Sequence, residues 1–407
     1  MHSNRRLFLA SSSLALAGLA IGARRLQAAT SVGSAAPKRI LILGGTGFLG
    51  PAVTAAAQAR GHSVSLFNRG KTEKVLHTKT DNTERFYGNR DPEKTADEKD
   101  PASAKGLESL KGQTWDAVVD TSGYFPRMVK ASAGLLAPSV KQYVFISSVS
   151  VYADNSTPGA DATSAVGKMA DETVETFGAS FENYGPAKAL CEQAAEAAMP
   201  GRVTNVRPGL IVGPGDPTGR FTYWPVRVAR GGEVLSPGTP NDPLQMVDVR
   251  DLAEWIIHLI ETGTMGVFDA ISPQNPAGKP GFTMGMLLDA CKEASGSNAT
   301  FTWCDAEFLG SQQVSPWGDM PLWIPPVGES AGFHTRNVQK SLDAGLKMRP
   351  VVDTCKATLE WFNGVAEGDR LKKIAAISPE REAEVLKAWH ARDQSKPVEK
   401  KEEKAAG

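Results

Sequence analysis

The stretch Arg39–Gly50, RILILGGTGFLG, constrains the fold of this chain more than any other part of the sequence. It begins with the unbroken apolar run Ile40–Leu43, which is typical of a strand buried on both faces of a parallel sheet. Glycines follow at once in the spacings G-x-G-x-x-G and G-x-x-G-x-x-G, and a turn without Cβ atoms lets a pyrophosphate approach the backbone. The residues predicted to form this phosphate-binding turn are Gly44, Gly45, Thr46, Gly47, Phe48, Leu49 and Gly50.

A glycine cluster by itself indicates only a tight turn, so the flanking elements decide the interpretation. An alanine-rich helix is predicted over residues 48–60, and its N-terminal amide groups would face the phosphate. A second strand, residues 62–67, follows at the spacing of a βαβ unit. The sequence therefore predicts dinucleotide binding in an α/β fold. We expect a Rossmann-type doubly wound parallel sheet of about seven strands with a smaller C-terminal α/β substrate lobe.

Residues 1–29 are typical of a targeting segment and are left out of the predicted fold. Arg5 and Arg6 precede an apolar stretch, residues 7–21, that is too short and too rich in Ser, Ala and Gly for a stable membrane span. The segment resembles a bacterial twin-arginine signal peptide. It therefore predicts engagement of the export machinery and a periplasmic or otherwise exported protein, and the alternative is a disordered basic leader.

The charge balance does not indicate a nucleic-acid partner. The chain has 45 basic and 45 acidic residues, and removal of residues 1–29 takes away four arginines and no acidic residue, which leaves 41 against 45. The sequence leaves open whether the chain forms a homodimer.

The four cysteines are scattered, without a C-x-x-C pair or a nearby histidine cluster, so no metal site is predicted. An oxidising compartment would permit a disulfide, for which Cys291 and Cys304 are the closest pair in sequence, but buried free thiols are the favoured interpretation.

The end of the second predicted strand bears on the choice of cofactor. Enzymes that use NAD place a carboxylate there for the ribose hydroxyls, whereas this chain has Asn68, Arg69 and Lys71. The two cations could pair with the 2′-phosphate of NADP, so NADP is favoured over NAD. The alternative is that both are solvated loop charges.

Two later strands end in polar residues that we expect over the cofactor. Thr121, Ser122 and Gly123 follow the strand 115–120, at the carboxyl edge where open α/β sheets bind ligands. Ser148 follows the strand 142–147.

A tyrosine and a lysine supply the expected acid/base chemistry. Tyr184 and Lys188 are four residues apart and so share one helix face, where the ammonium could lower the pKa of the phenol. Hydride chemistry at a carbinol needs such a phenol to exchange the hydroxyl proton and a serine such as Ser148 to orient the oxygen.

The glycine turn, Ser148 and the Tyr184-x-x-x-Lys188 motif together resemble the extended short-chain dehydrogenase/reductase superfamily, in its NAD-dependent epimerase/dehydratase-like branch. The resemblance covers residues 38–362, with the motifs in the family's order. It implies that Tyr184 is the acid/base, that Lys188 lowers its pKa and holds the nicotinamide ribose, and that Ser148 polarises the substrate oxygen.

The predicted domains follow from this reading. A dinucleotide-binding domain is expected over residues 38–205, a substrate-binding lobe over 206–365, and a helix with a disordered charged tail over 366–407. Tryptophans gather in the later half, in a Pro/Trp-rich loop around Trp317 and Trp323, for which we favour packing over an aromatic wall for substrate.

Departures from the family limit the function. Sugar-nucleotide dehydratases carry an Asp-Glu pair where this chain has Val149 and Ser150, so dehydration is disfavoured. Epimerases of nucleotide sugars carry a phosphate-binding arginine where alignment places Leu244, so a nucleotide diphosphate sugar is not expected.

The predicted activity is that of an NAD(P)-dependent oxidoreductase or epimerase. It would transfer hydride at a secondary alcohol or ketone of a carbohydrate-like small molecule, with a tightly held cofactor because an exported enzyme cannot draw on the cytoplasmic cofactor pool. The alternatives are an ordinary NADP-dependent reductase with a diffusing cofactor, and a non-catalytic member of the fold similar to the chloroplast stem-loop RNA-binding proteins. The sequence does not name the substrate.

Overall fold

The computed structural model describes residues 36–70, 83–91, 106–274, 281–367, 374 and 376–394, with the side chains of 393 and 394 left out. The described residues from Lys38 onward form one compact unit. The predicted signal segment, Lys71 and the predicted charged tail lie outside the described residues. No helix within the described ranges is long and apolar enough to cross a membrane.

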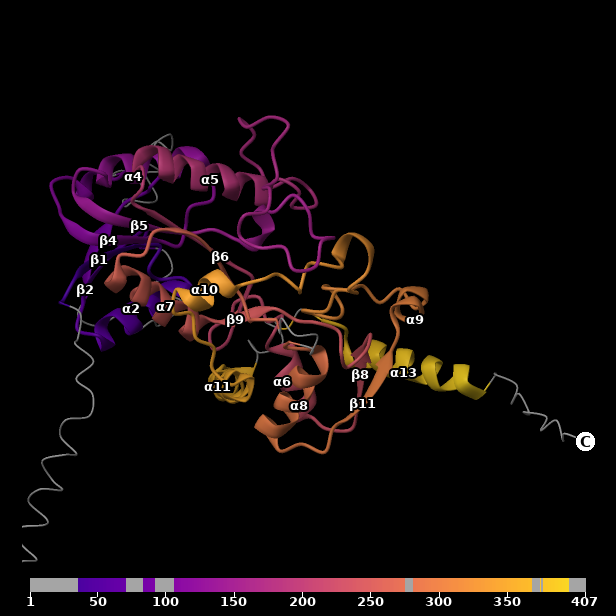
Figure 1. Cartoon of the computed structure of the whole chain (residues 1–407). Coiled ribbons are helices and arrows are strands. Elements are labelled where there is room, and N and C mark those ends of the chain that lie inside the picture. Colours follow the sequence, from indigo (N-terminus) through magenta and orange to yellow (C-terminus); the bar gives the residue numbers. More distant parts are fainter. Residues whose placement is uncertain are drawn as a thin grey trace, which may run out of the picture. The chain divides into compact units, whose positions relative to one another are not determined.

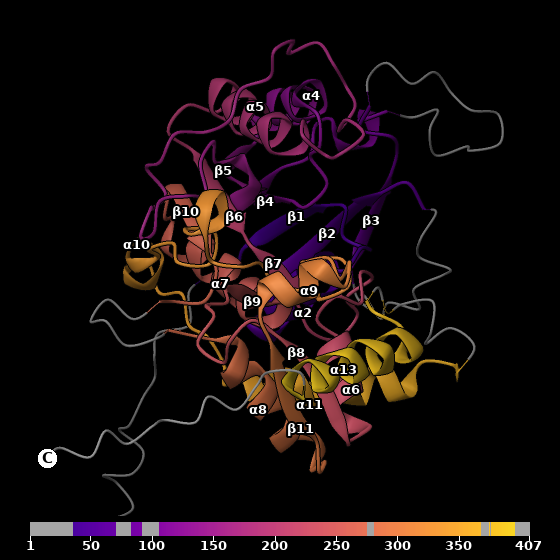
Figure 2. The same ribbon diagram turned by 90° about the vertical axis from the view of Figure 1, so that its right-hand side faces the viewer.

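A parallel sheet of seven strands organises the described part of the chain (Figure 2), which confirms the predicted fold class. Every neighbouring pair of strands is parallel. From one edge to the other, the strands are β10 (Gly266–Ala270), β6 (Val203–Pro208), β5 (Val140–Ile146), β4 (Trp115–Asp120), β1 (Arg39–Leu43), β2 (Ser63–Asn68) and β3 (Glu84–Tyr87).

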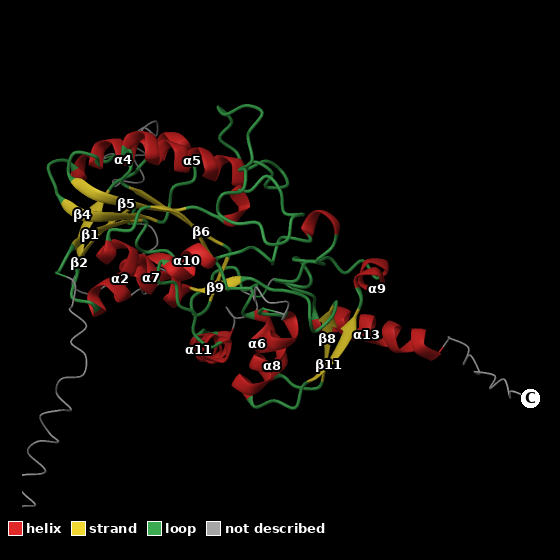
Figure 3. Ribbon diagram, in the orientation of Figure 1, coloured by secondary structure: helices red, strands yellow, loops and turns green. Residues whose placement is uncertain are grey.

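Helices cover both faces of the sheet (Figures 1 and 3), and the apolar run of β1 explains how. Successive side chains of a strand point to opposite faces, so an unbroken apolar run feeds two cores. Ile40 and Ile42 pack in the cluster with α2 (Leu49–Ala59) and α7 (Val249–Thr262). Leu41 and Leu43 pack in the cluster with α4 (Pro126–Leu136) and α5 (Tyr184–Ala198).

The edge strand β10 comes from the segment that the sequence assigned to the substrate lobe. It pairs with β6 from Gly266 opposite Thr204 to Ala270 opposite Pro208. The sheet therefore takes a strand from beyond residue 205, after the chain has passed through part of the later region. The short hydrophobic strand was not recognised in the sequence because its pattern is brief and its pairing is long-range.

The later region builds a second core below the sheet in Figure 1. Trp224 and Trp323 are buried there, and their indole N–H groups donate to the Pro321 carbonyl at 2.8 Å and to Asp242 Oδ2 at 2.7 Å. The elements of this region are β7 (Leu210–Val212) with β9 (Met246–Asp248), β8 (Glu233–Pro237) with β11 (Thr300–Cys304), α6 (Tyr223–Ala229), α8 (Met284–Ser295), α9 (Ala306–Ser311), α10 (Gln339–Asp343), α11 (Val351–Gly364) and α13 (Pro379–Gln394).

Helix α13 is tied to this second core by a buried glutamate. Glu382 accepts from Arg227 Nε at 2.6 Å and from the backbone N–H of Leu235 at 3.0 Å. Since both partners lie in α6 and β8, the last described helix completes the core rather than lying free on it.

All four cysteines are buried thiols. The thiol neighbour of Cys291 is Cys355 of α11, with Sγ atoms 3.6 Å apart. It is not Cys304, the cysteine nearest to Cys291 in sequence. Packing of α8 against α11 produces this pair, and sequence distance carries no information about it. The described residues contain no group of His, Cys, Asp and Glu that could hold a metal ion.

A buried ion pair fastens the segment before α10 to the sheet. The Arg336 side chain is 1% exposed, and its Nε donates to Asp269 of β10 at 3.3 Å. Its guanidinium also lies 3.3 Å from the centroid of the Tyr152 ring and donates to the Asp161 carbonyl at 2.8 Å. Burial raises the pKa of Asp269, and the Tyr152 hydroxyl and Arg336 oppose that rise.

Replacing Arg336 by Met is expected to lower the free energy of unfolding by about 3–5 kcal/mol, because Asp269 would stay buried without its cation. Urea unfolding followed by tryptophan fluorescence measures the change. The control Lys141→Met breaks an exposed pair with Asp116, which is worth less than about 1 kcal/mol. A loss for Arg336→Met no larger than that of the control would contradict the assignment.

Candidate active site

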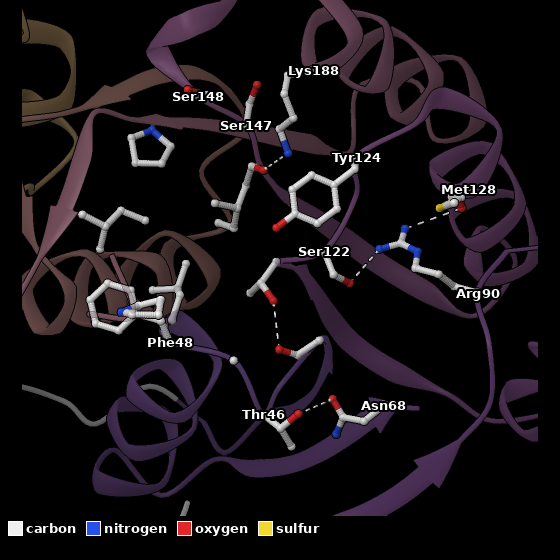
Figure 4. A pocket seen from close by; sticks show the side chains of 18 of the residues that line it. Thr46, Phe48, Asn68, Arg90, Ser122, Tyr124, Met128, Ser147, Ser148 and Lys188 are labelled. Atoms are coloured by element: carbon white, nitrogen blue, oxygen red, sulfur yellow. Dashed lines mark hydrogen bonds between the residues drawn. The ribbon is translucent and has the colours of Figure 1, made fainter. Parts of the chain in front are cut away.

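A cavity of about 620 Å³ opens at the carboxyl ends of the parallel strands, where ligands bind in sheets of this kind. Figure 4 shows Ser122, Tyr124 and Arg90 along one side of it, with Thr46 and Asn68 at another. The predicted site residues that line this cavity are Gly44, Thr46, Gly47, Phe48, Leu49, Asn68, Arg69, Thr121, Ser122, Ser148, Tyr184 and Lys188.

Glycine is needed at the positions of this turn for different physical reasons. Gly44 has φ +89°, which favours glycine, and a Cβ there would lie 2.7 Å from Thr121 Oγ1. A Cβ on Gly50 would lie 2.5 Å from the backbone of Gly45, so these two glycines let α2 pack close against the turn. A Cβ on Gly47 meets nothing nearer than 3.9 Å, so it would occupy open space in the cavity wall. Gly47 is therefore the position where a ligand can approach the backbone.

Of the predicted binding residues, Gly45, Gly50 and Gly123 do not line the cavity. A Cβ on Gly123 would lie 2.6 Å from the Phe145 ring, so this glycine permits close packing behind the cavity wall. Its carbonyl oxygen nevertheless contributes to the site, because it accepts from Lys188 Nζ at 2.7 Å.

The end of β2 carries no carboxylate facing the cavity. Asn68 is buried, and its Oδ1 accepts a hydrogen bond from Thr46 Oγ1 at 3.4 Å. Its Nδ2 has no partner within the described part of the protein. Arg69 is exposed at the rim of the same cavity. This end thus offers one cation and one unused amide donor.

Ser148 and Tyr184 are brought together by a glycine that the sequence reading passed over. Ser148 caps the short 3-10 helix Val149–Val151, and its Oγ accepts from the Ser150 N–H at 3.1 Å. Tyr184 is the first residue of α5, and the Ser148 side chain lies close enough to influence the pKa of its phenol. A Cβ on Gly185 would overlap the Ser150 carbonyl oxygen, so only glycine lets α5 begin this close to the serine turn.

Lys188 lies one helical turn beyond Tyr184 and is 3% exposed. Its Nζ donates to the carbonyls of Gly123 and Ile146, the latter at 2.6 Å, and lies 4.3 Å from the Phe145 ring centroid. Burial lowers the pKa of Lys188 to about 8.

The electrostatics of Tyr184 differ from the sequence expectation. Burial raises the pKa of the Tyr184 phenol, opposed by the hydrogen bond with Ser148 and by the charge of Arg220. The buried Lys188 ammonium, which donates to two backbone carbonyls, does not offset this rise. In this structure the phenol is therefore the protonated, acid form.

Sequence reasoning missed a charged network below the cavity. Asp120, at the end of β4, forms a bidentate pair with Arg90, and the Nη2–Oδ2 distance is 2.7 Å. Asp120 also accepts from the Ser122 N–H at 3.0 Å and from the Tyr143 hydroxyl at 2.7 Å. Burial opposes ionisation of Asp120, but Arg90 and these donors hold its pKa below the usual value. The sequence places Asp120 at a strand end, but nothing local names a partner thirty residues away.

Four buried polar atoms with no partner among the described residues belong to residues that line this cavity. A buried polar group without a hydrogen bond is costly, so such atoms mark places where a ligand completes the structure. They are Asn68 Nδ2, Arg90 Nε, Ser147 Oγ and Asp216 Oδ2.

The depressed pKa of Lys188 predicts how stability changes with pH. The unfolded chain holds a proton on this lysine up to its ordinary pKa of 10.5, whereas the folded chain begins to lose it near 8. The unfolded state therefore binds more protons between these values, and stability contributed at this residue rises with pH. Between pH 8 and 9.5 the gain is expected to be about 1–2 kcal/mol.

Urea unfolding of cofactor-free protein across this range measures the effect, with Lys188→Met as the comparison. The variant is expected to lack the rise. Parallel stability curves for the two proteins would contradict the assignment of a buried, titrating Lys188.

Comparisons with known proteins bear on the fold and the family of the chain. The chain is 26% identical over 287 residues to the Arabidopsis thaliana chloroplast stem-loop binding protein of 41 kDa b, a match that spans 66% of this chain and 66% of that relative. The WbmG enzyme of Bordetella bronchiseptica, solved in complex with NAD and UDP, shares the fold with a TM-score of 0.54 at 16% identity, over 82% of this chain and 96% of that one.

UDP-glucose 4-epimerase of Thermotoga maritima, solved with UDP-glucose, gives a TM-score of 0.52 at 18% identity, over 80% of this chain and 98% of that one. At these identities the structures establish the fold. Residues 40–269 match the NAD dependent epimerase/dehydratase family as a whole, a range that holds the glycine turn, Ser148, Tyr184 and Lys188. The chain belongs to the NAD dependent epimerase/dehydratase family.

Proposed function

We propose that this protein is an NAD(P)-dependent epimerase or oxidoreductase that acts at a secondary alcohol or ketone of a carbohydrate-like small molecule. The observation that carries the proposal is the position of Ser148, Tyr184 and Lys188 on one cavity with the open glycine turn at Gly47. Family membership independently supports a dinucleotide as the cofactor.

The residues present fit a dinucleotide. Gly47 leaves backbone open where a pyrophosphate would lie, and the N-terminal turn of α2 follows directly. Asn68 Nδ2 supplies an unused donor, and Arg69 supplies a cation that suits a 2′-phosphate. We therefore favour NADP over NAD. When bound, the nicotinamide supplies the acceptance and donation of hydride.

The chain's own residues supply the proton chemistry and the positioning. Tyr184 holds the proton that a substrate oxygen exchanges, and Ser148, which lines the same cavity beside the phenol, orients that oxygen. Lys188 has two of its three N–H donors on backbone carbonyls, which fixes the third toward the cavity it lines. In that place it would hold a ribose hydroxyl, and its charge would favour the phenolate.

The chemistry of neighbouring positions argues against two family activities. Val149 and Ser150 provide no carboxyl acid or base beside Ser148, so elimination of water has no catalyst there. Leu244, where related enzymes carry a phosphate-binding arginine, is 1% exposed and packs in the second core. We therefore propose a substrate without a nucleotide diphosphate.

Export would make a retained cofactor necessary. The paired arginines Arg5 and Arg6 motivate the proposal that the protein leaves the cytoplasm folded with its cofactor inside. A reaction that returns the substrate to its own oxidation state, such as epimerisation, needs no exchange of cofactor with a pool. We rank such a closed cycle ahead of an ordinary reductase with a diffusing cofactor.

The name of the Arabidopsis relative supports a second candidate, binding of structured RNA. The balanced charge of the chain and the complete Ser148, Tyr184 and Lys188 set count against it. Salt-sensitive retention of the purified protein on a stem-loop RNA would favour this candidate over the enzyme.

Replacing Tyr184 by Phe is expected to lower turnover by about 10²-fold or more, the usual worth of a positioned acid/base, while dinucleotide binding changes little. A screen of secondary alcohols with cofactor absorbance as the readout supplies the substrate. The matched control is Tyr223→Phe, which removes a buried hydroxyl in the second core that has no partner in the described structure. Full activity of Tyr184→Phe on the substrate found would remove Tyr184 from the mechanism.

Protein purified from the exported fraction is expected to release about one dinucleotide per chain on denaturation, because a closed cycle retains its cofactor. Chromatography of the released nucleotide identifies it, and NADP is the expected species because of Arg69. Protein that is empty and binds dinucleotide weakly and reversibly would overturn retention, and release of NAD alone would overturn the choice of NADP.

A further inference from the structure

A further arginine, Arg220, lines the cavity that also holds Tyr184 and Ser148. Arg220 belongs to the loop between β7 and α6 and lines the same cavity. Its Nε donates to Thr218 Oγ1 at 3.2 Å, and its guanidinium lies 5.2 Å from the centroid of the Trp317 ring. Arg220 and Tyr184 line the same cavity, and the charge of Arg220 opposes the rise in the pKa of Tyr184.

The other two arginines that line the cavity differ from Arg220. Arg90 is paired with Asp120, and Arg69 stands at the β2 edge. For Arg220, no carboxylate within the described ranges comes to ion-pair distance. A guanidinium has five N–H donors in a planar fork, and toward the described residues the Arg220 side chain uses one of them, the Nε–H that donates to Thr218.

Arg220 is half-buried, and its surroundings favour a counter-ion for its charge. Burial disfavours its charged form, so that the pKa is lowered, and Asp216 and Tyr184 only oppose that effect. A partly desolvated cation with open donors is stabilised by an anion that binds it in a bidentate manner. The Trp317 ring holds the guanidinium in place from another side.

A second observation points to a ligand at the same place. The Asp216 side chain is 1% exposed; its Oδ1 accepts from the Thr218 N–H at 2.8 Å and from Thr218 Oγ1 at 2.7 Å. Its Oδ2 has no partner among the described residues, although Asp216 lines the cavity. A buried carboxylate oxygen without a partner can accept a hydrogen bond from a hydroxyl group of a ligand.

We propose that Arg220 binds an anionic group of the substrate and that Asp216 accepts a hydrogen bond from one of the substrate's hydroxyls. The substrate is therefore a hydroxylated acid. This inference rests on the proposed function, because it assigns the group that holds the substrate while its carbinol faces Tyr184 and Ser148. A carboxylate and a phosphate monoester share the chemistry that Arg220 recognises. Arg220 is a specificity-determining residue in this arrangement.

The test is binding of three probes to the cofactor-loaded full chain by isothermal titration calorimetry. D-glucuronate carries a carboxylate, D-glucose 6-phosphate a phosphate, and D-glucose neither. At least one anion is expected to bind about 10-fold or more tighter than D-glucose, the usual worth of a hydrogen bond between charged groups. The tighter of the two anions identifies the group.

Variants assign the effect to the residue. Arg220→Met is expected to remove the preference for the anion and to leave D-glucose binding unchanged, whereas Arg220→Lys retains part of it. The matched control, Arg230→Met, removes the same charge from the exposed end of α6 and is expected to keep the preference. Asp216→Asn is expected to weaken all three probes.

Equal binding of the three probes, no measurable binding of either anion, or an equal loss in Arg230→Met would overturn the inference. The readout does not require turnover, so its failure is separate from that of the proposed function. If Tyr184→Phe abolishes turnover while the protein binds anions no better than D-glucose, the proposed enzyme is supported and the anion site is contradicted. If anions bind through Arg220 while Tyr184→Phe stays fully active, the anion site stands and the acid/base assignment falls.

Discussion

The buried pair of Arg90 and Asp120 is the interaction on which the site depends. Asp120 ends β4 in the middle of the sheet, and its carboxylate holds the Ser122 N–H and the Tyr143 hydroxyl while Arg90 neutralises it. Arg90 in turn donates to Ser122 Oγ at 3.1 Å. Breaking such a pair leaves a charge in the interior, at a cost of about 3–5 kcal/mol. The cavity floor is therefore fixed by electrostatics as much as by packing.

On that floor, the reactive groups are held by backbone rather than by one another. Lys188 is directed at the Gly123 and Ile146 carbonyls, and Ser148 caps its own 3-10 turn. The contact of α5 with that turn depends on the absence of a side chain at Gly185. Substrate and cofactor would thus meet a site whose geometry is already set. The protonation of Tyr184, by contrast, is set by burial and open to adjustment by what binds.

Local patterns in the sequence were enough to predict the fold of the molecule and part of the site. The apolar run of β1 indicated a strand with two buried faces, and the four-residue spacing of Tyr184 and Lys188 placed both on the cavity. Arg90, Asp216 and Arg220 could not be assigned in this way, because their importance comes from partners or from unmet hydrogen bonds that only the folded chain defines. The pKa of Tyr184 was likewise beyond the sequence, since burial outweighs the neighbouring ammonium.

Two late segments complete the fold: β10 pairs with β6, and Glu382 of α13 accepts hydrogen bonds from α6 and β8. Both contacts have a consequence for folding during synthesis. A ribosome delivers β1 to β5 first, yet the sheet edge is closed only by residues 266–270, and the second core only by α13 near the end of the chain. Such long-range closures slow folding and leave unpaired edges exposed while synthesis continues. Completion of the fold therefore waits for both of these late segments, and a chain shortened before residue 379 would present an unfinished core to the cell's proteases.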